Sequence, residues 1–285
     1  MTGGPAAQRT TTGIGSLSFG PAPVLVGVIN VTPDSFSDGG EFFEAEAAVA
    51  QARALLEEGA QVIDVGGEST RPGSDPVSPE EELRRVLPVI RGVLSARPDA
   101  AVSIDTYRYS TAEAALDAGA RVVNDVTALG DPKMAGLVAE RGCTLILMHM
   151  LGEPKSMQQD PRYKDVVREV RDFLAERAER AIRAGVGPEN LIIDPGIGFG
   201  KTLEHNLKLL DRLDSLVQLG FPVLVGASRK SFLGKITGSE DPKKRLFGTV
   251  AANVLAYERG ATFFRVHDVG ANGEALAVAA AIRGS

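Results

Sequence analysis

The chain has 285 residues, of which 44% are hydrophobic and 24% charged, a composition typical of a globular protein and unlike a disordered or fibrous chain. The formal net charge is −6 and the basic residues are spread along the sequence, so we expect no nucleic-acid partner. No stretch approaches the ~20 apolar residues that cross a membrane, so we expect no membrane partner. A role with small molecules is favoured.

Residues 1–20 are rich in Gly, Thr, Ala and Ser but lack the basic start and apolar core of a secretion signal. We interpret them as a flexible N-terminal leader and residues 21–285 as one domain, because no linker or break in composition divides the rest. The single cysteine, Cys143, opens an apolar run, which predicts a small buried side chain and, with no disulfide possible, a cytoplasmic location.

Eight short runs rich in Val, Ile and Leu predict strands, and their starts lie about 34 residues apart on average, far enough for a crossover helix in each interval. The predicted strands are 24–30, 62–67, 102–106, 122–126, 145–149, 191–196, 223–228 and 263–267.

The intervals contain apolar residues at helical spacing. The predicted helices are 44–58, 79–96, 110–118, 133–141, 163–184, 203–219, 244–257 and 272–282. A glycine follows several of them, as at a left-handed helix end, namely Gly59, Gly119, Gly142, Gly185, Gly220 and Gly260. Alternating strands and helices could form an open doubly wound sheet, but eight units in this length favour a single-domain (β/α)8 TIM barrel.

Polar side chains stand at the C-terminal ends of most predicted strands, the face where such barrels build their active sites. These residues are Asn30, Asp64, Glu68, Asp105, Asn124, Asp125, His149, Asp194, Arg265 and His267, with Ser228, Arg229 and Lys230 directly after the seventh strand. Each has a purely structural alternative. Asp64 could anchor a neighbouring loop, whereas carboxylates at Asp105 and Asp194 are costly in apolar strands unless a cation or several donors meet them.

The histidines do not predict a zinc site, because no His and carboxylate pair has the required spacing. We interpret His149 as a satisfied residue at the edge of the core, with a chemical role as the alternative, and His205 as a local capping or packing residue near the start of its helix. The cations after strands seven and eight predict a phosphate site: Lys230, Arg265 and His267 would face Asn30 and Arg71. Arg229 has the alternative of solvated surface charge.

Two loops have an unusual composition, 31–40 after the first strand and 68–76 after the second. Both are rich in turn formers and hydroxyl groups, and they carry Phe36 and Arg71 respectively. They could close over a substrate as lids, or they could be long turns.

At these residues the sequence resembles the dihydropteroate synthase family from about residue 24 to residue 269. The matching motifs include Asp64-Val-Gly-Gly-Glu-Ser-Thr-Arg-Pro-Gly73, Asp194-Pro-Gly-Ile-Gly-Phe-Gly-Lys201 and Arg265-Val-His-Asp-Val269, together with 27–40, 103–106 and 226–234. One departure is Thr127-Ala-Leu-Gly130, where many members of the family have Ser-Gly-Gly.

The resemblance implies three groups of binding residues. The pterin would be held by Asp105, Asn124, Met148, Asp194 and Lys230. Pyrophosphate would be held by Asn30, Thr70, Arg71, Arg265 and His267, with Mg²⁺ on Asn30. Para-aminobenzoate would lie between Phe36, Thr70, Pro72, Phe199 and Ser231.

The implied reaction is displacement of pyrophosphate from the methylene carbon of 6-hydroxymethyl-7,8-dihydropterin pyrophosphate by the amine of para-aminobenzoate. It would be SN1-like, with Asp105, Asp194, Lys230, Arg265 and His267 controlling charge, in a homodimer. Two alternatives stay open: a barrel that transfers methyl from methyltetrahydrofolate, which has no use for a pyrophosphate clamp, and a non-catalytic pterin-binding paralogue.

Overall fold

Eight parallel strands form one sheet that closes on itself. The computed structural model describes residues 12–14, 17–19, 22–32, 40–69, 74–153 and 155–284. The strand order is β8-β7-β6-β5-β4-β3-β10-β9. A parallel bridge between Ile193 and Val223 joins the two edges of this order. The predicted (β/α)8 barrel is therefore confirmed.

The strands are short and keep close to their predicted ranges, apart from the seventh. They are β3 (Val24–Asn30), β4 (Val62–Gly66), β5 (Ala101–Asp105), β6 (Val122–Asp125), β7 (Thr144–Met148), β8 (Leu191–Asp194), β9 (Leu224–Val225) and β10 (Phe263–Val266). The prediction of a strand over 223–228 was wrong for 226–228, because the chain there leaves the sheet and turns toward the barrel mouth.

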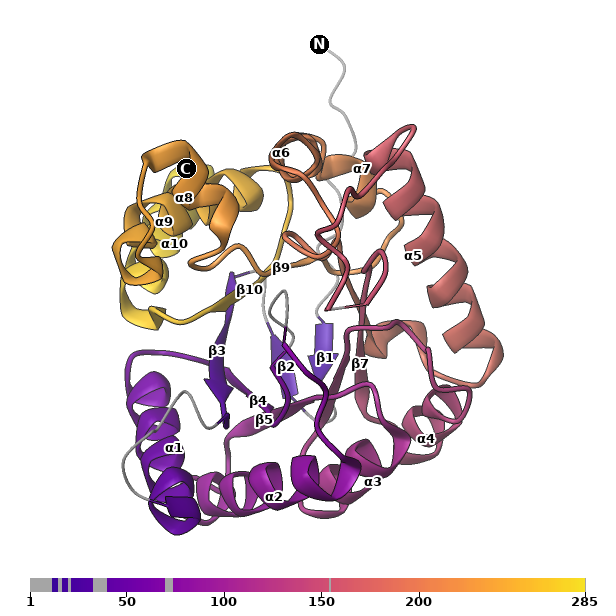
Figure 1. Ribbon diagram of the computed structural model, residues 1–285, viewed down its shortest axis with the longest axis vertical. Coiled ribbons are helices and arrows are strands. Elements are labelled where there is room, and N and C mark those ends of the chain that lie inside the picture. Colours follow the sequence, from indigo (N-terminus) through magenta and orange to yellow (C-terminus); the bar gives the residue numbers. More distant parts are fainter. Residues whose placement is uncertain are drawn as a thin grey trace.

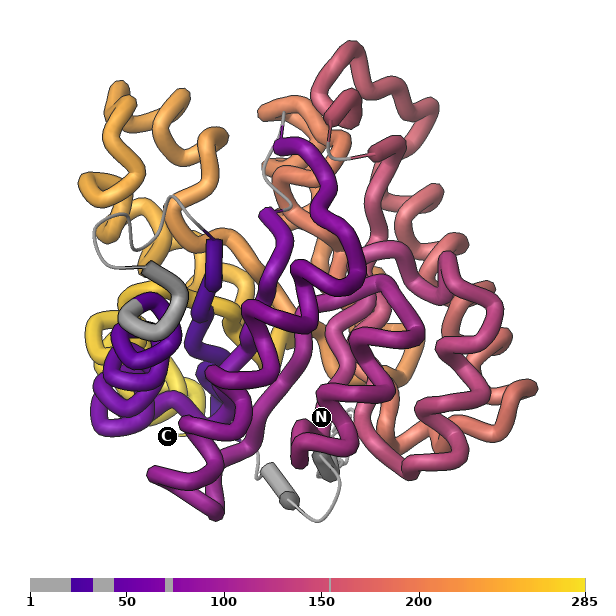
Figure 2. The backbone as a smooth tube through the Cα atoms, turned by 60° about the horizontal axis from the view of Figure 1, so that its bottom comes forward, coloured from indigo at the N-terminus to yellow at the C-terminus, as the bar shows by residue number. Residues whose placement is uncertain are grey.

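Helices surround the strands as an outer ring (Figure 1). They are α1 (Gly40–Glu57), α2 (Pro79–Ala96), α3 (Tyr109–Asp117), α4 (Met134–Arg141), α5 (Val166–Arg183), α6 (Leu203–Asp211), α7 (Asp214–Val217), α8 (Ser231–Thr237), α9 (Leu246–Glu258) and α10 (Val269–Gly284), with 3₁₀ turns η2 (Pro188–Asn190) and η3 (Pro242–Arg245). Figure 2 shows the last helix, in yellow, beside the first, in indigo. The backbone N–H of Gly270 donates to Glu58, just after α1, at 3.0 Å. None of these helices is long and apolar enough to span a membrane.

The predicted helix over 203–219 is two helices, α6 and α7. Its apolar spacing is continuous, but the guanidinium of Arg259 donates to the Asp211 carbonyl at 2.6 Å. That carbonyl would otherwise accept from the N–H of Ser215, which instead bonds to the Arg212 carbonyl. The carbonyl left free at this break is therefore bound by a side chain that follows α9, a contact that local spacing does not reveal. The six glycines predicted at helix ends all have positive φ, between 59° and 106°.

Two apolar layers stabilise the barrel. The inner layer fills the barrel and takes one or two side chains from each strand, namely Val24, Val26, Val62, Ala101, Val122, Ile146, Ile192, Leu224 and Phe263. The outer layer lies between strands and helices and includes Ile29, Ile63, Leu145 and Phe264. Cys143 belongs to this layer, as predicted. The inner layer closes the lower part of the barrel, so a ligand can enter only at the carboxyl end of the strands.

Part of the expected leader has defined structure. The strands β1 (Thr12–Ile14) and β2 (Leu17–Phe19) pair antiparallel. Strand β1 packs beside η2, which leads into the N-terminal end of β8. These two strands lie at the end of the barrel opposite the predicted site, and the flexibility expected for residues 1–20 stays a prediction.

Candidate active site

Strand periodicity directs the predicted polar residues into the barrel. Side chains on one strand alternate between its two faces, so a residue an even number of positions from an inner-layer residue also points inward. This relation holds on seven of the eight strands of the barrel, all except the two-residue strand β9. It links Val26 to Asn30, Val62 to Asp64, Ala101 to Asp105, Val122 to Asn124, Ile146 to Met148, Ile192 to Asp194, and Phe263 to Arg265. The site therefore lies directly above the apolar floor.

Arg265 connects two buried carboxylates in the centre of this site. Its Nε donates to Asp64 Oδ2 at 2.5 Å and its Nη2 donates to Asp105 Oδ2 at 2.6 Å. The amide of Asn124 donates to the same Asp64 oxygen at 3.1 Å. Asp64 therefore belongs to the site and does not anchor a loop, which decides between the two sequence interpretations. The structure brings Asp105, Asn124 and Arg265 together as predicted.

Burial shifts the protonation equilibria of these groups. Burial, with the nearby Asp64 charge, raises the pKa of Asp105 to about 7 although Arg265 opposes the shift. Burial also raises the pKa of Asp194, against the effect of Lys230. Burial lowers the pKa of Lys230 to about 7, while Asp194 acts in the opposite direction. For Arg265 burial lowers the pKa, but Asp64 and Asp105 outweigh it and leave the pKa raised. Such perturbed groups in one place are typical of a functional site.

A second half of the site is built from the turn after β8. Asp194 Oδ1 accepts the N–H of Gly196 at 2.7 Å. The ammonium of Lys230 donates to the Ile197 carbonyl and lies 4.4 Å from the centre of the Phe199 ring. Phe199 in turn packs in a small apolar cluster with Val126, Met148 and Met157. The predicted neighbours Met148, Asp194, Phe199 and Lys230 thus form one wall.

Ser228 and Arg229 lie in the loop after β9, and His267 directly follows β10. Ser228 Oγ accepts the backbone N–H of His267 at 3.2 Å and lies 3.0 Å from its Nδ1. If the hydroxyl donates to Nδ1, the ring proton is on Nε2, where it can donate to an anion. Arg229 forms an ion pair with Asp268 at 2.5 Å and has a φ of 57°. Arg229 is therefore a loop anchor rather than solvated surface charge.

The remaining predicted residues divide into two groups. Asn30 ends β3 beside Gly66 and is half-buried, and Ser231 is the exposed first residue of α8. Phe36, Thr70, Arg71 and Pro72 lie outside the described residues. Among the residues that the structure describes, no group of three His, Cys, Asp or Glu side chains is arranged to hold a metal ion.

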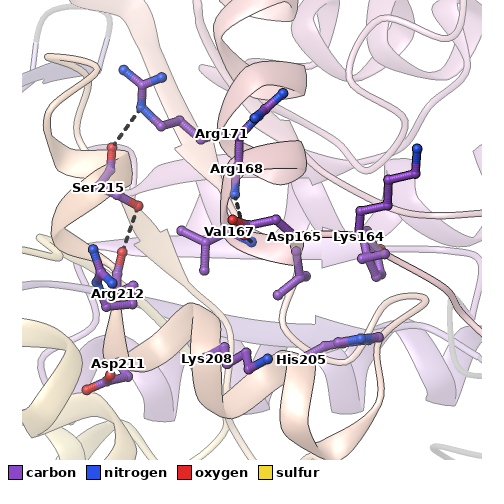
Figure 3. A pocket seen from close by; sticks show the side chains of 12 residues that line it. Lys164, Asp165, Val167, Arg168, Arg171, His205, Lys208, Asp211, Arg212 and Ser215 are labelled. Atoms are coloured by element: carbon purple, nitrogen blue, oxygen red, sulfur yellow. Dashed lines mark hydrogen bonds between the residues drawn. The ribbon is translucent and has the colours of Figure 1, made fainter.

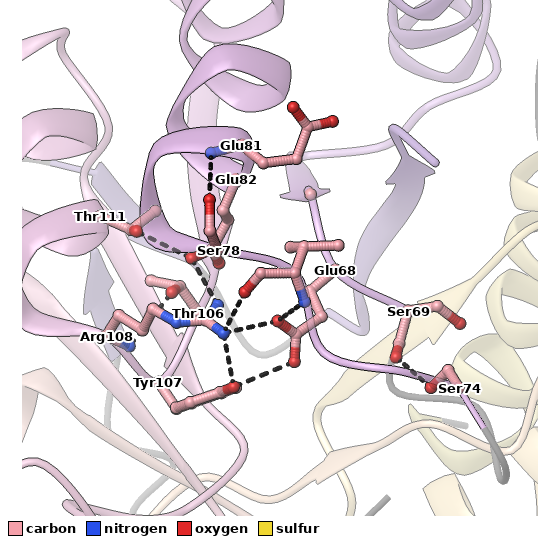
Figure 4. A network of polar contacts seen from close by, with 12 residues as sticks. Glu68, Ser69, Ser74, Ser78, Glu81, Glu82, Thr106, Tyr107, Arg108 and Thr111 are labelled. Carbon is pink, nitrogen blue, oxygen red and sulfur yellow. Dashed lines mark hydrogen bonds and ion pairs between the residues drawn. The ribbon is translucent and has the colours of Figure 1, made fainter. Parts of the chain in front are cut away.

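A buried charge network, which the sequence did not reveal, holds the base of the loop after β4 (Figure 4). Arg108 donates to Glu68 at 2.7 Å, to Glu82 at 2.8 Å and to the Val77 carbonyl at 2.9 Å. Glu68 also accepts from the Tyr107 hydroxyl at 3.0 Å and from the Val77 N–H at 3.1 Å. Glu68, assigned by sequence to the strand end, therefore ties both ends of this loop to β5 and α2.

The loop after β6, where the chain departs from the family pattern, has a left-handed backbone at two residues that are not glycine. Ala128 and Leu129 both have positive φ, 48° and 70°, a conformation that favours glycine. The buried carboxylate of Asp125 accepts from the N–H groups of Thr127 and Leu129 at 2.8 and 2.7 Å. Asp125 thus stabilises a left-handed turn without glycine and does not face the site.

The two other histidines behave as local structural residues. His205 completes a capping box with Thr202 at the start of α6, as predicted. His149 is buried beside Phe173, with ring centres 4.9 Å apart, and contacts Lys201. Burial and the Lys201 charge lower the pKa of His149 to about 3, so the ring is neutral.

A cavity of about 570 Å³ lies outside the barrel mouth, between α5, α6 and α7 (Figure 3). Its lining includes Lys208, Arg212 and His205. Two carboxylates in its wall have other partners: Asp165 caps α5 and Asp211 forms an ion pair with Arg259. It contains none of the residues to which we assigned chemistry, so the barrel mouth is the candidate active site.

Comparison with known proteins places this geometry in a family. A family model described as pterin binding enzyme matches residues 26–267. Dihydropteroate synthase of Synechocystis sp. is 46% identical over 265 residues, which is 93% of this chain and 91% of that protein. A probable bifunctional folylpolyglutamate synthase/dihydropteroate synthase of Haloferax volcanii is 46% identical over 278 residues, but the chain spans only 33% of its length.

Solved structures agree with this result over nearly the whole fold. Xanthomonas albilineans dihydropteroate synthase with 4-aminobenzoic acid has a TM-score of 0.91 and 46% identity, covering 97% of this chain and 100% of that one. The same enzyme in complex with 7,8-dihydropteroate has a TM-score of 0.88 and 43% identity at the same coverage. The chain therefore belongs to the pterin binding enzymes and, within them, to the dihydropteroate synthases.

Proposed function

We propose that this chain condenses 6-hydroxymethyl-7,8-dihydropterin pyrophosphate with para-aminobenzoate to give 7,8-dihydropteroate and pyrophosphate. The observation that carries the proposal is the set of polar groups above the inner apolar layer, in which buried Asp105, Asn124 and Asp194 lie close to half-buried Arg265 and Lys230. Neighbours with 4-aminobenzoic acid and with 7,8-dihydropteroate support the two ends of the reaction.

The pterin is assigned to the deepest part of the mouth. Its amino-pyrimidinone edge presents N–H donors, which the carboxylates of Asp105 and Asp194 and the amide oxygen of Asn124 can accept. Lys230 would donate to the pterin's oxygen and ring nitrogen, since its ammonium lies on the same wall as Asp194. Met148 would supply apolar contact from the end of β7.

Pyrophosphate is assigned to Arg265 in the centre of the site and to the donors that surround it. Arg265 lies on β10 and His267 directly follows that strand, while Asn30 is the last residue of β3, which pairs with β10. Thr70 and Arg71 would complete the clamp from the loop whose base is tied by Arg108. Arg offers paired donors to phosphate oxygens, so it suits a diphosphate better than a single point charge does.

Mg²⁺ fits Asn30, because Mg²⁺ commonly uses one or two protein oxygens and takes its other ligands from water and substrate phosphates. The half-buried amide at the end of β3 can supply one such oxygen. Bound there, Mg²⁺ would act as a Lewis acid on the departing pyrophosphate. Para-aminobenzoate is assigned to the space beside Phe199 and Ser231, with Phe36, Thr70 and Pro72.

The chemistry is a substitution at the methylene carbon of the pterin. The bond from carbon to the pyrophosphate oxygen breaks, the amine nitrogen bonds to the same carbon, and the nitrogen then loses a proton. The buried carboxylates of Asp105 and Asp194 stabilise positive charge that develops on the pterin, which favours an SN1-like course. An arylamine attacks such a cation without prior deprotonation, so no strong general base is required.

The proposal is tested with purified protein, Mg²⁺ and both substrates, by following dihydropteroate and pyrophosphate. Turnover should be lost in Lys230→Ala and Arg265→Ala, which remove the cations of the two halves of the site. It should persist in Lys235→Ala, an exposed lysine on the neighbouring α8. Folded wild-type protein that binds pterin without turnover would instead support a non-catalytic paralogue, and methyl transfer from methyltetrahydrofolate would support the methyltransferase alternative.

We further propose that the chain forms a homodimer through α9 and α10, which pack side by side in the outer ring (Figure 1). Phe247 and Leu255 on α9 are 85% and 56% exposed, and Ile282 on α10 is 71% exposed. Such apolar exposure on adjacent helices is typical of an interface. Phe247→Asp should give a monomer in light scattering.

We also propose a cytoplasmic location, because the single cysteine, Cys143, is a free thiol in the core and the chain therefore has no internal disulfide.

A further inference from the structure

Lys201 is a buried lysine that the proposed chemistry does not use. It follows the turn after β8 and is 3% exposed. Among the described residues, its ammonium forms no ion pair within 4.0 Å, and its partners are uncharged. They are the Phe199 carbonyl at 2.9 Å, the His149 Nδ1 at 3.0 Å and the His149 carbonyl at 3.4 Å. Three acceptors match the three N–H donors of an ammonium.

These partners belong to two different loops of the barrel mouth. His149 follows Met148 in the loop after β7, whereas Phe199 lies in the turn after β8. The two backbones approach so closely that only glycine fits: a Cβ on Gly196 would lie 1.9 Å from the His149 carbonyl oxygen, and one on Gly200 would lie 2.4 Å from that of Leu151. Lys201 is the charged group at this contact.

The turn that Lys201 holds carries two contacts of the site. The Phe199 ring lies under the Lys230 ammonium, and the Ile197 carbonyl accepts from that ammonium. The Gly198 N–H is also fixed, because it donates to Asn206 Oδ1 at 2.7 Å. Loss of the Lys201 contacts would release the Phe199 carbonyl, whereas Asp105 and Asn124 on the opposite side keep their own partners.

We propose that Lys201 is a positioning residue that holds the turn after β8 against the loop after β7 and so places the Phe199 ring for para-aminobenzoate. This inference rests on the proposed function, in which para-aminobenzoate lies beside Phe199. Lys201 acts through backbone carbonyls and touches neither substrate.

The charges around Lys201 fit this role. Burial lowers its pKa to about 7, Asp194 opposes that shift and Lys230 adds to it. Its hydrogen bond to Nδ1 requires that this nitrogen accepts, which places the ring proton of His149 on Nε2. His149 thus reports on Lys201, because the lysine charge is one cause of its lowered pKa.

The test compares Lys201→Met, which keeps the length of the side chain without its charge, with Lys208→Met, an exposed lysine on α6. In Lys201→Met we expect the KM for para-aminobenzoate to rise by on the order of 10-fold or more, while the Kd of 6-hydroxymethyl-7,8-dihydropterin changes by less than about 3-fold. NMR titration should show a higher pKa for His149. Lys208→Met should match the wild type in all three.

A second variant distinguishes loss of the Lys201 contacts from a general folding defect. His149→Leu removes one acceptor but leaves both carbonyls, so it should raise the same KM by a smaller factor, with no further rise when added to Lys201→Met. The inference would be overturned if Lys201→Met weakened the binding of the pterin and of para-aminobenzoate by the same factor. It would also be overturned if both the KM for para-aminobenzoate and the pKa of His149 stayed unchanged. If the wild type shows no turnover while the His149 pKa still rises in Lys201→Met, the proposed function fails and the contact between the loops stands.

Discussion

The protonation of Asp105 and Lys230 should make pterin binding depend on pH. A ligand edge made of N–H donors requires ionised Asp105, whose pKa in the free protein is raised to about 7. Lys230 has to be protonated to donate, and its pKa is lowered to about 7. Binding should therefore release a proton from Asp105 below pH 7 and take one up on Lys230 above it.

The magnitude follows from the fraction of protein in the competent form. With both pKa values at about 7, about a quarter of the molecules are competent at pH 7, and about 1 in 30 at pH 5.5 or 8.5. The Kd should therefore be lowest near pH 7 and rise about 8-fold toward either side, roughly 1.2 kcal/mol.

Calorimetry measures the Kd of 6-hydroxymethyl-7,8-dihydropterin at each pH, and this ligand has no pyrophosphate group that would itself titrate. Repeating the titrations in buffers of different ionisation enthalpy gives the number of protons released or taken up on binding. Asp105→Asn should bind the pterin more weakly, and the part of the rise in Kd below pH 7 that comes from protonation of Asp105 should disappear. Lys230→Met should lose the rise above pH 7, while Asp131→Asn, in the loop after β6, should match the wild type. A rise below pH 7 of the same size in Asp105→Asn as in the wild type would refute the reasoning.

Three further predictions concern neighbouring groups. Asp64→Asn removes a negative charge that raises the pKa of Asp105, so the low-pH rise in Kd should move to lower pH in the same calorimetric series; a move to higher pH would contradict this. Asp125→Ala leaves the buried N–H of Leu129 without an acceptor and should lower the free energy of unfolding by about 2–3 kcal/mol in urea, against less than about 1 kcal/mol for Asp131→Ala, which removes a half-buried acceptor. Phe199→Leu should raise the KM for para-aminobenzoate more than that for the pterin pyrophosphate in steady-state assays, and an equal rise for both would argue against its assigned place.

The sequence predicted the barrel because both signals that define it are local. Strand period and helix spacing repeat along the chain, and polar residues at even spacing from the inner layer point into the mouth, as Asp105 and Asp194 do. That spacing also indicated Asp64, which the sequence left undecided because its partner Arg265 is distant in the chain.

What the sequence did not reveal depends on contacts between distant segments. Arg108 and Lys201 look like ordinary charged residues in the sequence, and only the packed loops show that Lys201 is buried and Arg108 half-buried. At the break between α6 and α7, Arg259 donates to a carbonyl of α6, and the left-handed turn at Ala128 is held by Asp125. Arg108, Lys201 and Arg259 each satisfy a backbone carbonyl far along the chain, whereas Asp125 bonds to N–H groups two and four residues away.

The measurement that tests the central claim most directly uses pterin pyrophosphate labelled with ¹⁸O at the oxygen that bridges the methylene carbon and the phosphorus. Substitution at carbon predicts that the purified protein forms dihydropteroate and pyrophosphate in equal amounts and that all of the label leaves with pyrophosphate. Label retained on the pterin, or no dihydropteroate from protein that binds both substrates, would contradict the account.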